Sequence, residues 1–207
     1  SLNLTLTTTN NFTGDNLTLT LNVSDAENDG VKNVTNWYES NISTTVLNMP
    51  FEGGSDSVFT KDYSNNTNDG TVNNALWNSI GGVDGRGMYE FDGNGDYITV
   101  PEITFVATDN WTINFWLNST RNGAVMPIGK KASFNYISPS FSGNTITFRN
   151  SSGAQAAVGT GVINTDQWYF FTMLSNRSDG VSVYVDGSYK GEIDVVPDWS
   201  IDNIGAA

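Results

Sequence analysis

Apolar and polar residues alternate along most of this chain, and long runs with the 3.6-residue period of an amphipathic helix do not occur. The alternation is strict in residues 2–7 and 17–23, where Leu or Val occupies every second position. It recurs in residues 111–117 and 181–185. Because successive side chains of a strand point to opposite faces, each run predicts a strand with one apolar and one polar face. The sequence therefore predicts an all-β fold.

Turn signals separate these predicted strands. Asp-Gly pairs and one Asn-Gly pair occur along the chain, and such dipeptides readily adopt the positive φ angles of tight hairpin turns. They occupy positions 29–30, 69–70, 84–85, 92–93, 122–123, 179–180 and 186–187. Many short strands joined by tight turns predict an antiparallel β-sandwich.

The strand pattern also predicts the core. Residues 168–174 are apolar at both parities, so we expect a central strand that is covered on both faces. Alternation in the other runs predicts that one face of each strand is buried. The side chains expected in the core are Phe91, Ile98, Ile113, Phe115, Trp168, Phe170, Val183 and Val185.

A domain boundary is expected near residues 43–50. Three candidate strands precede it, at about residues 2–9, 16–24 and 31–38. An immunoglobulin-like sandwich needs about seven strands, so these three do not form one by themselves. We predict that residues 1–45 are a partial β-segment or a donor-strand extension, and that residues 46–207 form the main domain.

The composition excludes several functional classes. The 207 residues include no Cys and no His, which excludes thiol catalysis, zinc sites and His-based acid–base chemistry. Acidic residues outnumber basic ones 22 to 9, and the resulting net charge of -13 repels phosphate backbones, so we expect no nucleic-acid partner. The longest apolar run, residues 168–174, is much shorter than the roughly 18 residues of a spanning helix, so no membrane insertion of this segment is expected.

Neutral polar residues dominate instead, and many form the Asn-x-Ser/Thr acceptor pattern for N-glycans. These sequons are about twice as frequent as chance predicts from the Ser and Thr content. Strand parity or turn position favours glycans at Asn3, Asn22, Asn118 and Asn176. The alternative is a Thr- and Asn-rich β-protein in which sequons are incidental. The predicted sites are Asn3, Asn11, Asn16, Asn22, Asn33, Asn41, Asn65, Asn110, Asn118, Asn150 and Asn176.

A series of motifs from residue 47 onward resembles a known family. They occupy residues 47–53, 62–65, 68–71, 85–93, 96–101, 111–116, 168–170 and 183–187. In order and spacing they resemble a laminin G-like, concanavalin A-like jelly-roll domain of prokaryotic cell-surface proteins. The resemblance implies a jelly-roll β-sandwich over residues 46–207. Residues 1–45 resemble, over fewer features, the polycystic-kidney or immunoglobulin-like modules that often precede such domains.

Two departures from the family pattern affect the predicted structure. The family commonly has Trp-His-His where this chain has Trp168, Tyr169 and Phe170, which removes any imidazole. Its closing strand reads roughly Gly-x-Ile-Asp-Glu-Val-Arg-Ile-Tyr, whereas this sequence stops at residues 204–207. We therefore expect the jelly roll to lack its last strand, which leaves an apolar groove and unpaired edges. Residues 2–7 of another copy could fill that groove by strand donation; a cut or partial polypeptide is the alternative.

Acidic residues at two places are candidates for calcium binding. Residues 92–96 imitate the opening of an EF-hand loop, but Tyr97 and Ile103 stand where that loop needs Gly and Glu, so a hairpin turn is the preferred interpretation. The family resemblance instead implies Glu52 and Asp62 as calcium ligands. Solvated turn carboxylates are the alternative. No other cofactor is expected.

An enzymatic role is not expected. Residues 192–194 resemble the start of the Glu-Ile-Asp-x-x-Glu signature of jelly-roll glycoside hydrolases, which need two paired carboxylates. Pro197 replaces the second Glu, and the absence of His excludes the usual serine triad. Exposed aromatic rings are the usual platform for sugars, although most Trp residues of a sandwich belong to its core. The candidate platforms are Trp37, Trp77, Trp116 and Trp199.

The sequence therefore predicts an extracellular, N-glycosylated module of a cell surface with a structural or adhesive role and no active site. Its expected partners are neighbouring copies or adjacent domains of a surface protein, and glycans. One alternative is a subunit of an extracellular filament that assembles by strand donation between copies. Another is a carbohydrate-binding lectin module.

Overall fold

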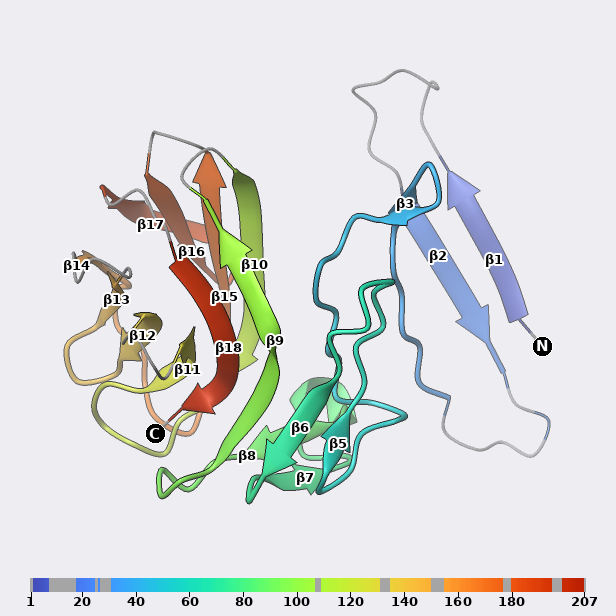
Figure 1. Ribbon diagram of the computed structural model, residues 1–207, viewed down its shortest axis with the longest axis horizontal. Helices are drawn as coiled ribbons and strands as arrows, with labels where there is room; N and C mark the ends of the chain where they lie inside the picture. Colours follow the sequence, from blue (N-terminus) through green and yellow to red (C-terminus); the bar gives the residue numbers. More distant parts are fainter. Residues whose placement is uncertain are drawn as a thin grey trace. The chain divides into compact units, whose positions relative to one another are not determined.

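Antiparallel strands make up nearly all of the regular structure in the computed structural model (Figure 1). It describes residues 2–7, 18–24, 26, 31–106, 109–130, 135–149, 155–176, 180–194 and 199–206. Within these residues the one helical element is a 3₁₀ turn, Val83–Gly85, which confirms the all-β prediction. None of them forms a helix long and apolar enough to cross a membrane. The chain divides into two compact units, Ser1–Thr35 and Asn36–Ala207.

The first unit contains a two-stranded antiparallel sheet of β1 (Leu2–Thr7) and β2 (Thr18–Val23). Its register pairs Leu2 with Val23, Leu4 with Leu21 and Leu6 with Leu19. The apolar positions of the two strands therefore lie opposite each other in the ladder. Both predicted strands are confirmed. The third, expected at residues 31–38, is wrong because residues 31–37 form no strand.

The boundary between the units lies between Thr35 and Asn36, N-terminal to the predicted position at residue 45. A small hairpin of β3 (Tyr38–Glu39) and β4 (Ile42–Ser43) belongs to the second unit. It is attached there by hydrogen bonds: Asn36 Nδ2 donates to the carbonyl oxygen of Tyr63 at 3.2 Å, and the Tyr38 hydroxyl donates to Asn65 Oδ1 at 3.2 Å. These side-chain contacts between distant segments are not visible in the alternation pattern.

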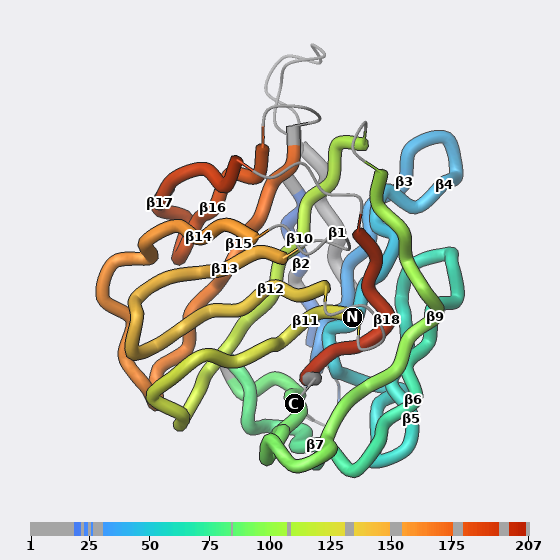
Figure 2. The backbone as a smooth tube through the Cα atoms, turned by 60° about the vertical axis from the view of Figure 1, so that its left-hand side comes forward, coloured from blue at the N-terminus to red at the C-terminus, as the bar shows by residue number. Residues whose placement is uncertain are grey.

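Two sheets form the sandwich of the second unit (Figures 1 and 2). The smaller has the order β10 (Asn110–Leu117), β15 (Tyr169–Asn176), β16 (Val181–Val185) and β17 (Ser188–Ile193). The larger has the order β14 (Gln155–Gly159), β13 (Thr145–Arg149), β12 (Asn135–Ser140), β11 (Met126–Lys130), β18 (Trp199–Ala206), β9 (Tyr97–Phe105), β6 (Gly70–Asn73) and β5 (Phe59–Thr60). A separate hairpin joins β7 (Leu76–Asn78) to β8 (Met88–Glu90).

Aromatic side chains fill the main core between the two sheets. Trp199 lies 4.9 Å from Phe148 and 5.1 Å from Phe105, measured between ring centroids, and Trp111 lies 5.7 Å from Trp199. A second apolar cluster lies on the larger sheet beyond β9, where Phe51 meets Tyr89 edge-on at 5.0 Å. The buried members of this cluster are Val72, Ala75, Tyr89, Ile98 and Val100.

The predicted core is correct for some strands and shifted by one residue in β15. Ile98, Val183 and Val185 are buried as expected. The partly buried side chains of Phe91, Ile113 and Phe115 pack against the two clusters. In β15 the buried apolar residues are Tyr169, Phe171 and Met173, whereas Phe170, and Trp168 just before the strand, are partly exposed.

The expectation that β15 is covered on both faces is also wrong. The strand is central in its sheet, between β10 and β16. Its core face is buried, but Leu174 on the other face is 39% exposed and Phe170 is partly exposed. The smaller sheet packs on the core with one face only, so Phe170 and Leu174 lie on the face of β15 that is directed away from the core.

The prediction of a missing closing strand is wrong as well. Strand β18 lies inside the larger sheet, between β11 and β9, with Trp199 and Ile201 buried. Strand β18 therefore occupies the interior position of the sheet that was expected to be missing. In the described part of the chain, the smaller sheet ends at β10 on one side and at β17 on the other.

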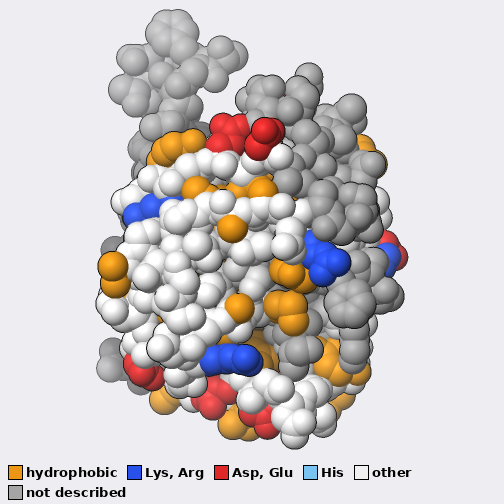
Figure 3. Space-filling model, turned by 90° about the vertical axis from the view of Figure 1, so that its left-hand side faces the viewer, with side chains coloured by type: hydrophobic (Ala, Val, Ile, Leu, Met, Phe, Trp, Pro, Cys, Tyr) orange, Lys and Arg blue, Asp and Glu red, His pale blue; other side chains and the backbone are white. Residues whose placement is uncertain are grey.

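Charged side chains are sparse on the surface. On the face shown in Figure 3, blue and red side chains are scattered among mostly white atoms, which are backbone and neutral polar groups. This agrees with a chain in which only 15% of residues are charged. Solubility of this face therefore depends on neutral polar groups.

Candidate functional site

The outer face of the smaller sheet carries a group of aromatic side chains. The register places Trp116 of β10 opposite Phe170 of β15, and Tyr184 of β16 opposite Tyr189 of β17. The next residue in β15, Phe171, is fully buried, so Phe170 must lie on the opposite, solvent-facing side. We define the aromatic face as Trp116, Phe170, Tyr184 and Tyr189 together with Asn114 and Thr172.

The aromatic rings of this face pack against each other in two pairs. Trp116 is 50% exposed, and its ring centroid lies 5.0 Å from that of Phe170 with an interplanar angle of 40°. Tyr189 is 57% exposed and lies 5.4 Å from Tyr184 at 60°. Such pairs stabilise each other by about 0.5–1.5 kcal/mol beyond their buried area. The two pairs therefore give the surface rigid aromatic groups that remain accessible.

Polar side chains lie between the aromatic pairs. Asn114 is opposite Thr172, and Thr172 is opposite Tyr184 on its other side. An amide, a hydroxyl and a phenol are thus aligned across three strands, beside Trp116. These groups both donate and accept hydrogen bonds. A sugar ring has C–H groups on its face and hydroxyls around its rim, so the arrangement is suited chemically to carbohydrate.

The four predicted tryptophan platforms have different surroundings. Trp116 belongs to the aromatic face, and Trp37 is 39% exposed next to the β3–β4 hairpin. Trp77 is partly buried, and its Nε1 donates to the Phe51 carbonyl oxygen at 3.0 Å. Trp199 is 2% exposed, so its prediction as a platform is wrong. It fails because β18 lies within the larger sheet rather than at the surface.

Of the four aromatic residues of this face, the sequence predicts only Trp116 as a platform. The prediction of Phe170 as a core residue is wrong, and neither Tyr184 nor Tyr189 is named among the sequence predictions. A signal existed: residues 168–174 are apolar at both parities, and Tyr184 occupies the polar parity of residues 181–185. An aromatic residue at a solvent parity is the pattern that predicts such a surface.

The two predicted calcium ligands, Glu52 and Asp62, are both buried, at 3% exposure each. Glu52 Oε1 accepts a hydrogen bond from the Gly87 N–H at 2.9 Å. Asp62 Oδ1 accepts from the N–H groups of Asn48 at 2.9 Å and Ser64 at 2.8 Å. Its other oxygen, Oδ2, accepts from the Ser64 hydroxyl at 2.6 Å and from the Asn68 N–H at 3.0 Å. Both carboxylates therefore hold loop backbone in place.

These contacts lower the pKa of Asp62. Burial by itself raises the pKa of this carboxyl, but the hydrogen bonds from Ser64, Asn48 and Asn68 outweigh it and hold the pKa below its usual range. The charged form is thus the one that the loop stabilises. Asp62 is expected to remain ionised at neutral pH.

The same hydrogen bonds are relevant to the predicted calcium binding at Glu52 and Asp62. Calcium takes six to eight oxygen ligands, usually including several carboxylates. In the described part of the chain, no group of three or more acidic side chains is placed to hold a metal ion. N–H and O–H groups occupy both oxygens of Asp62 and point hydrogen atoms at them. Calcium binding at Glu52 and Asp62 stays a prediction, whereas their structural role is evident.

The segment that imitates an EF-hand forms a tight turn. Gly93 and Gly95 have φ angles of 79° and 83°, Asp96 Oδ2 accepts from the Asp92 N–H at 2.8 Å, and Asp92 Oδ1 accepts from the Asn94 N–H at 2.7 Å. The preferred interpretation as a turn is confirmed, but the turn is not a hairpin. Strand β8 before it pairs with β7, and β9 after it pairs with β6 and β18.

The hydrolase-like segment lies at the edge of the smaller sheet. Glu192 is exposed on β17, opposite Ser182, and Ile193 is buried. Asp194 follows the strand and is exposed. Pro197, which replaces the second Glu of the hydrolase signature, lies outside the described residues.

The predicted glycosylation sites divide by their surroundings. Asn33, Asn41, Asn65 and Asn110 are exposed, whereas Asn118 is partly buried just after β10. The remaining predicted side chains lie outside the described part of the chain. They are Asn3, Asn11, Asn16, Asn22, Asn150 and Asn176.

Comparison with protein families identifies the fold of the second unit. The Laminin_G_3 model, described as the concanavalin A-like lectin/glucanases superfamily, matches residues 92–206, more than half of the chain. The chain belongs to this superfamily. The match spans β9 to β18 and confirms the predicted jelly-roll sandwich of this superfamily member. It does not include residues 1–45, whose immunoglobulin-like resemblance stays a prediction. No curated protein matches the chain.

Solved structures are similar to this superfamily member in fold. The binding domain of Paraclostridial Mosquitocidal Protein 1 has a TM-score of 0.57 and 16% identity, covering 78% of this chain and 44% of the other. The binding domain of botulinum neurotoxin serotype D has a TM-score of 0.56 and 15% identity, with coverage of 77% and 42%. The receptor binding domain of the botulinum neurotoxin C/D mosaic serotype has a TM-score of 0.52 and 14% identity, covering 78% of this chain and 48% of the other. The chain spans less than half the length of these similar structures.

Proposed function

We propose that this chain is an extracellular, non-enzymatic adhesion module of a cell surface that binds carbohydrate through its aromatic face. The observation that carries the proposal is the exposed Trp116–Phe170 pair beside Asn114 and Thr172. Membership of a superfamily named for lectins supports a binding role. The similar solved structures are titled binding or receptor-binding domains, which agrees with a binding module at the coarse level.

Burial energetics support a ligand at this surface. Large apolar side chains are normally placed inside a domain, and contiguous exposed ones mark interaction sites. Trp116 and Tyr189 are each at least half exposed, and Leu174 and the partly exposed Phe170 lie on the same face. A bound sugar would cover aromatic area here without requiring the sheet to change.

The chemistry of the chain argues against catalysis. A retaining glycosidase needs two carboxyl groups about 5–5.5 Å apart, as nucleophile and acid/base. The sequence supplies Glu192 and Asp194 of the signature but has Pro197 in place of the second Glu, and it has no His or Cys to substitute. The superfamily also includes glucanases, so absence of activity is part of the proposal.

A glycan array followed by calorimetric titration tests the proposed binding. We expect wild-type protein to bind a subset of glycans, and Trp116→Ala to lose at least about tenfold in affinity, equivalent to about 1.4 kcal/mol. Trp37→Ala is the matched control because Trp37 is also exposed but lies next to the β3–β4 hairpin. Absence of glycan binding by the wild type, or equal losses in both variants, would contradict the proposal.

An extracellular location is proposed from the excess of sequons and from the family. Four described sequon asparagines are exposed and therefore accessible to a glycosylating enzyme. The test is the intact mass of the protein from its native source. A mass equal to the bare chain of 22.4 kDa would argue against glycosylation.

A second candidate function is assembly of copies into an extracellular filament. The open edge of β10 favours it, because an unpaired edge can accept a strand from another molecule. Light scattering on the purified chain over a concentration series tests for assembly. A mass of 22.4 kDa at every concentration would contradict it.

A further inference from the structure

The two sides of the sandwich differ in how the sheets end. On one side β17 lies against β14, so closely that a Cβ on Gly191 would be 2.4 Å from Val158 Cγ2. On the other side the smaller sheet stops at β10, while the larger sheet continues beyond β9 with β6 and β5. The larger sheet is therefore wider than the smaller one. Among the residues that the structure describes, no strand pairs with the outer edge of β10.

The backbone groups at this edge can be identified from neighbouring hydrogen bonds. The Phe170 N–H donates to Asp186 Oδ1 at 2.8 Å, and the Phe170 carbonyl accepts from the Asp186 N–H at 2.9 Å. The N–H and C=O groups of Phe170 thus point toward β16, and those of Phe171 point toward Phe115 of β10. In β10, the residues that alternate with Phe115 must then point their N–H and C=O groups to the open edge. They are Thr112, Asn114 and Trp116.

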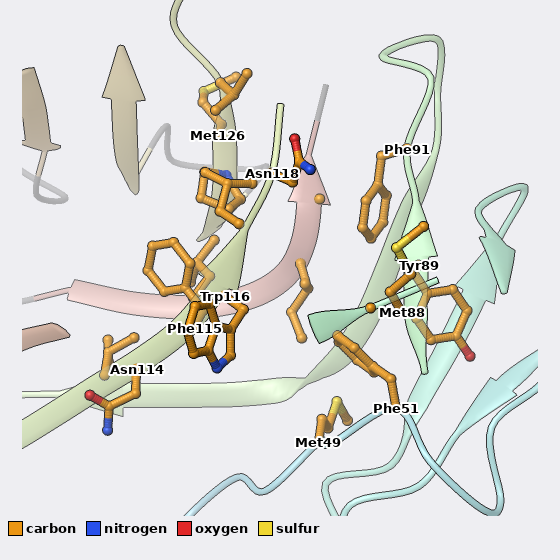
Figure 4. A pocket seen from close by; sticks show the side chains of 18 of the residues that line it. Met49, Phe51, Met88, Tyr89, Phe91, Asn114, Phe115, Trp116, Asn118 and Met126 are labelled. Carbon is orange, nitrogen blue, oxygen red and sulfur yellow. The ribbon is translucent and has the colours of Figure 1, made fainter. Parts of the chain in front are cut away.

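An apolar groove runs beside this edge. Its volume is about 2100 Å³, and it lies wholly within the second unit. Phe115 and Leu117 line it from β10, and Met49, Phe51 and Phe91 line it from the facing segments. Figure 4 shows Phe115 and Trp116 on one side of the groove and Phe51, Met88 and Phe91 on the other. The groove is suited to a strand with an apolar side chain at every second position.

Charge limits which part of another copy can enter the groove. Two copies with a net charge of -13 repel each other, so contact is least costly where neither surface is charged. Strand β10 contains no charged residue, and neither do β1 and β2. These two strands also alternate apolar and neutral polar residues, as the groove requires. Each has one open edge in a two-stranded sheet, which is marginally stable by itself.

We propose that the open edge of β10 accepts β1 of a second copy of this chain. The β1–β2 hairpin would extend the smaller sheet, with the positions of Leu2, Leu4 and Leu6 directed at the groove. The contact is heterologous, because one copy offers β10 and the other offers β1, so it propagates into a chain of copies. This inference deepens the assembly proposal and rests on it.

Complementation between two defective variants tests the pairing. In the full chain, Leu4→Lys places a charge in the donor strand, and Asn114→Pro removes an N–H from the acceptor edge. Lys lowers the net negative charge, so repulsion cannot explain a loss of assembly. Thr5→Lys is the matched control, with the same charge on the other face of β1. If Asn114→Pro lowers the melting temperature, Met88→Lys in the groove wall replaces it.

Sedimentation velocity over a concentration series gives the readout. We expect the wild type and Thr5→Lys to assemble, increasingly at higher salt, and each defective variant to remain at 22.4 kDa. A mixture of the two variants should form dimers and nothing larger, since it contains one intact edge and one intact donor. Assembly unaffected by both substitutions would overturn this inference but leave the assembly proposal intact. A wild type that is monomeric at all concentrations would overturn both, including the case where a chain fills its own groove.

Discussion

Gly87 lies directly against the carbonyl group of Phe51: a Cβ on this glycine would be 1.9 Å from that oxygen. The same oxygen accepts a hydrogen bond from Trp77 Nε1, and the Gly87 N–H donates to Glu52. Segments 50–52, 77 and 87 are therefore joined at one point. This junction fixes the wall of the groove that faces β10.

We expect Gly87→Ala to destabilise the second unit by about 2–4 kcal/mol, because the methyl group would have to displace backbone. Gly93→Ala is the control: its φ of 79° makes Ala unfavourable, but no atom lies within 4 Å of the added Cβ. Conformational strain alone should cost about 1–2 kcal/mol there. Urea unfolding of both variants checks this, and a Gly93 effect equal to or larger than that of Gly87 would disprove the close-packing argument.

Asp62 should make stability depend on acid pH. Its folded pKa is lowered, so the stability it contributes is present above its unfolded pKa of about 3.9 and is lost as pH falls through the lower, folded pKa. Asp62→Asn should therefore cost about 2–3 kcal/mol at pH 7 and flatten the stability profile below about pH 4.

The exposed Asp166 provides the control for this measurement, since Asp166→Asn should change stability by less than about 0.5 kcal/mol. Thermal melts in calcium and in EDTA separate the two interpretations of Asp62. A purely structural carboxylate predicts identical melting temperatures. A rise of several degrees with calcium would instead establish a bound ion.

Glycan occupancy should follow accessibility. We expect Asn33, Asn41, Asn65 and Asn110 to be modified more completely than Asn118, which is partly buried. This revises the expectation from turn position, which favoured Asn118. Peptide mapping of natively sourced protein by mass spectrometry gives the occupancy of each sequon. Full occupancy at Asn118 with empty sites at the four exposed residues would refute the accessibility argument.

No hydrolysis of β-glucans is expected. Pro197 stands where a glycosidase of this fold has its second catalytic Glu, and no His is present to act as an acid or base. Reducing-sugar release should match a protein-free blank. Turnover that disappears in Glu192→Gln would show that the segment is catalytic after all.

The sequence determined the features that depend on neighbouring residues. Alternation in residues 2–7, 111–117 and 181–185 placed strands correctly, because the period of two is a local property of extended backbone. It also placed Trp116 among the candidate sugar platforms. The all-β class and the jelly-roll domain followed from the same local patterns and from the family resemblance.

Tertiary structure decided which face of a strand is buried where both faces are apolar. The pattern of residues 168–174 does not indicate which face of the strand is buried. Only pairing with β10 and β16 directs Phe171 to the core and Phe170 to the outer face. The position of β18 between β9 and β11 likewise depends on partners about 75–100 residues earlier in the chain, at separations where sequence pattern has no information. The aromatic face and the open edge of β10 therefore exist only in the assembled sandwich, because each combines residues that meet through long-range strand pairing.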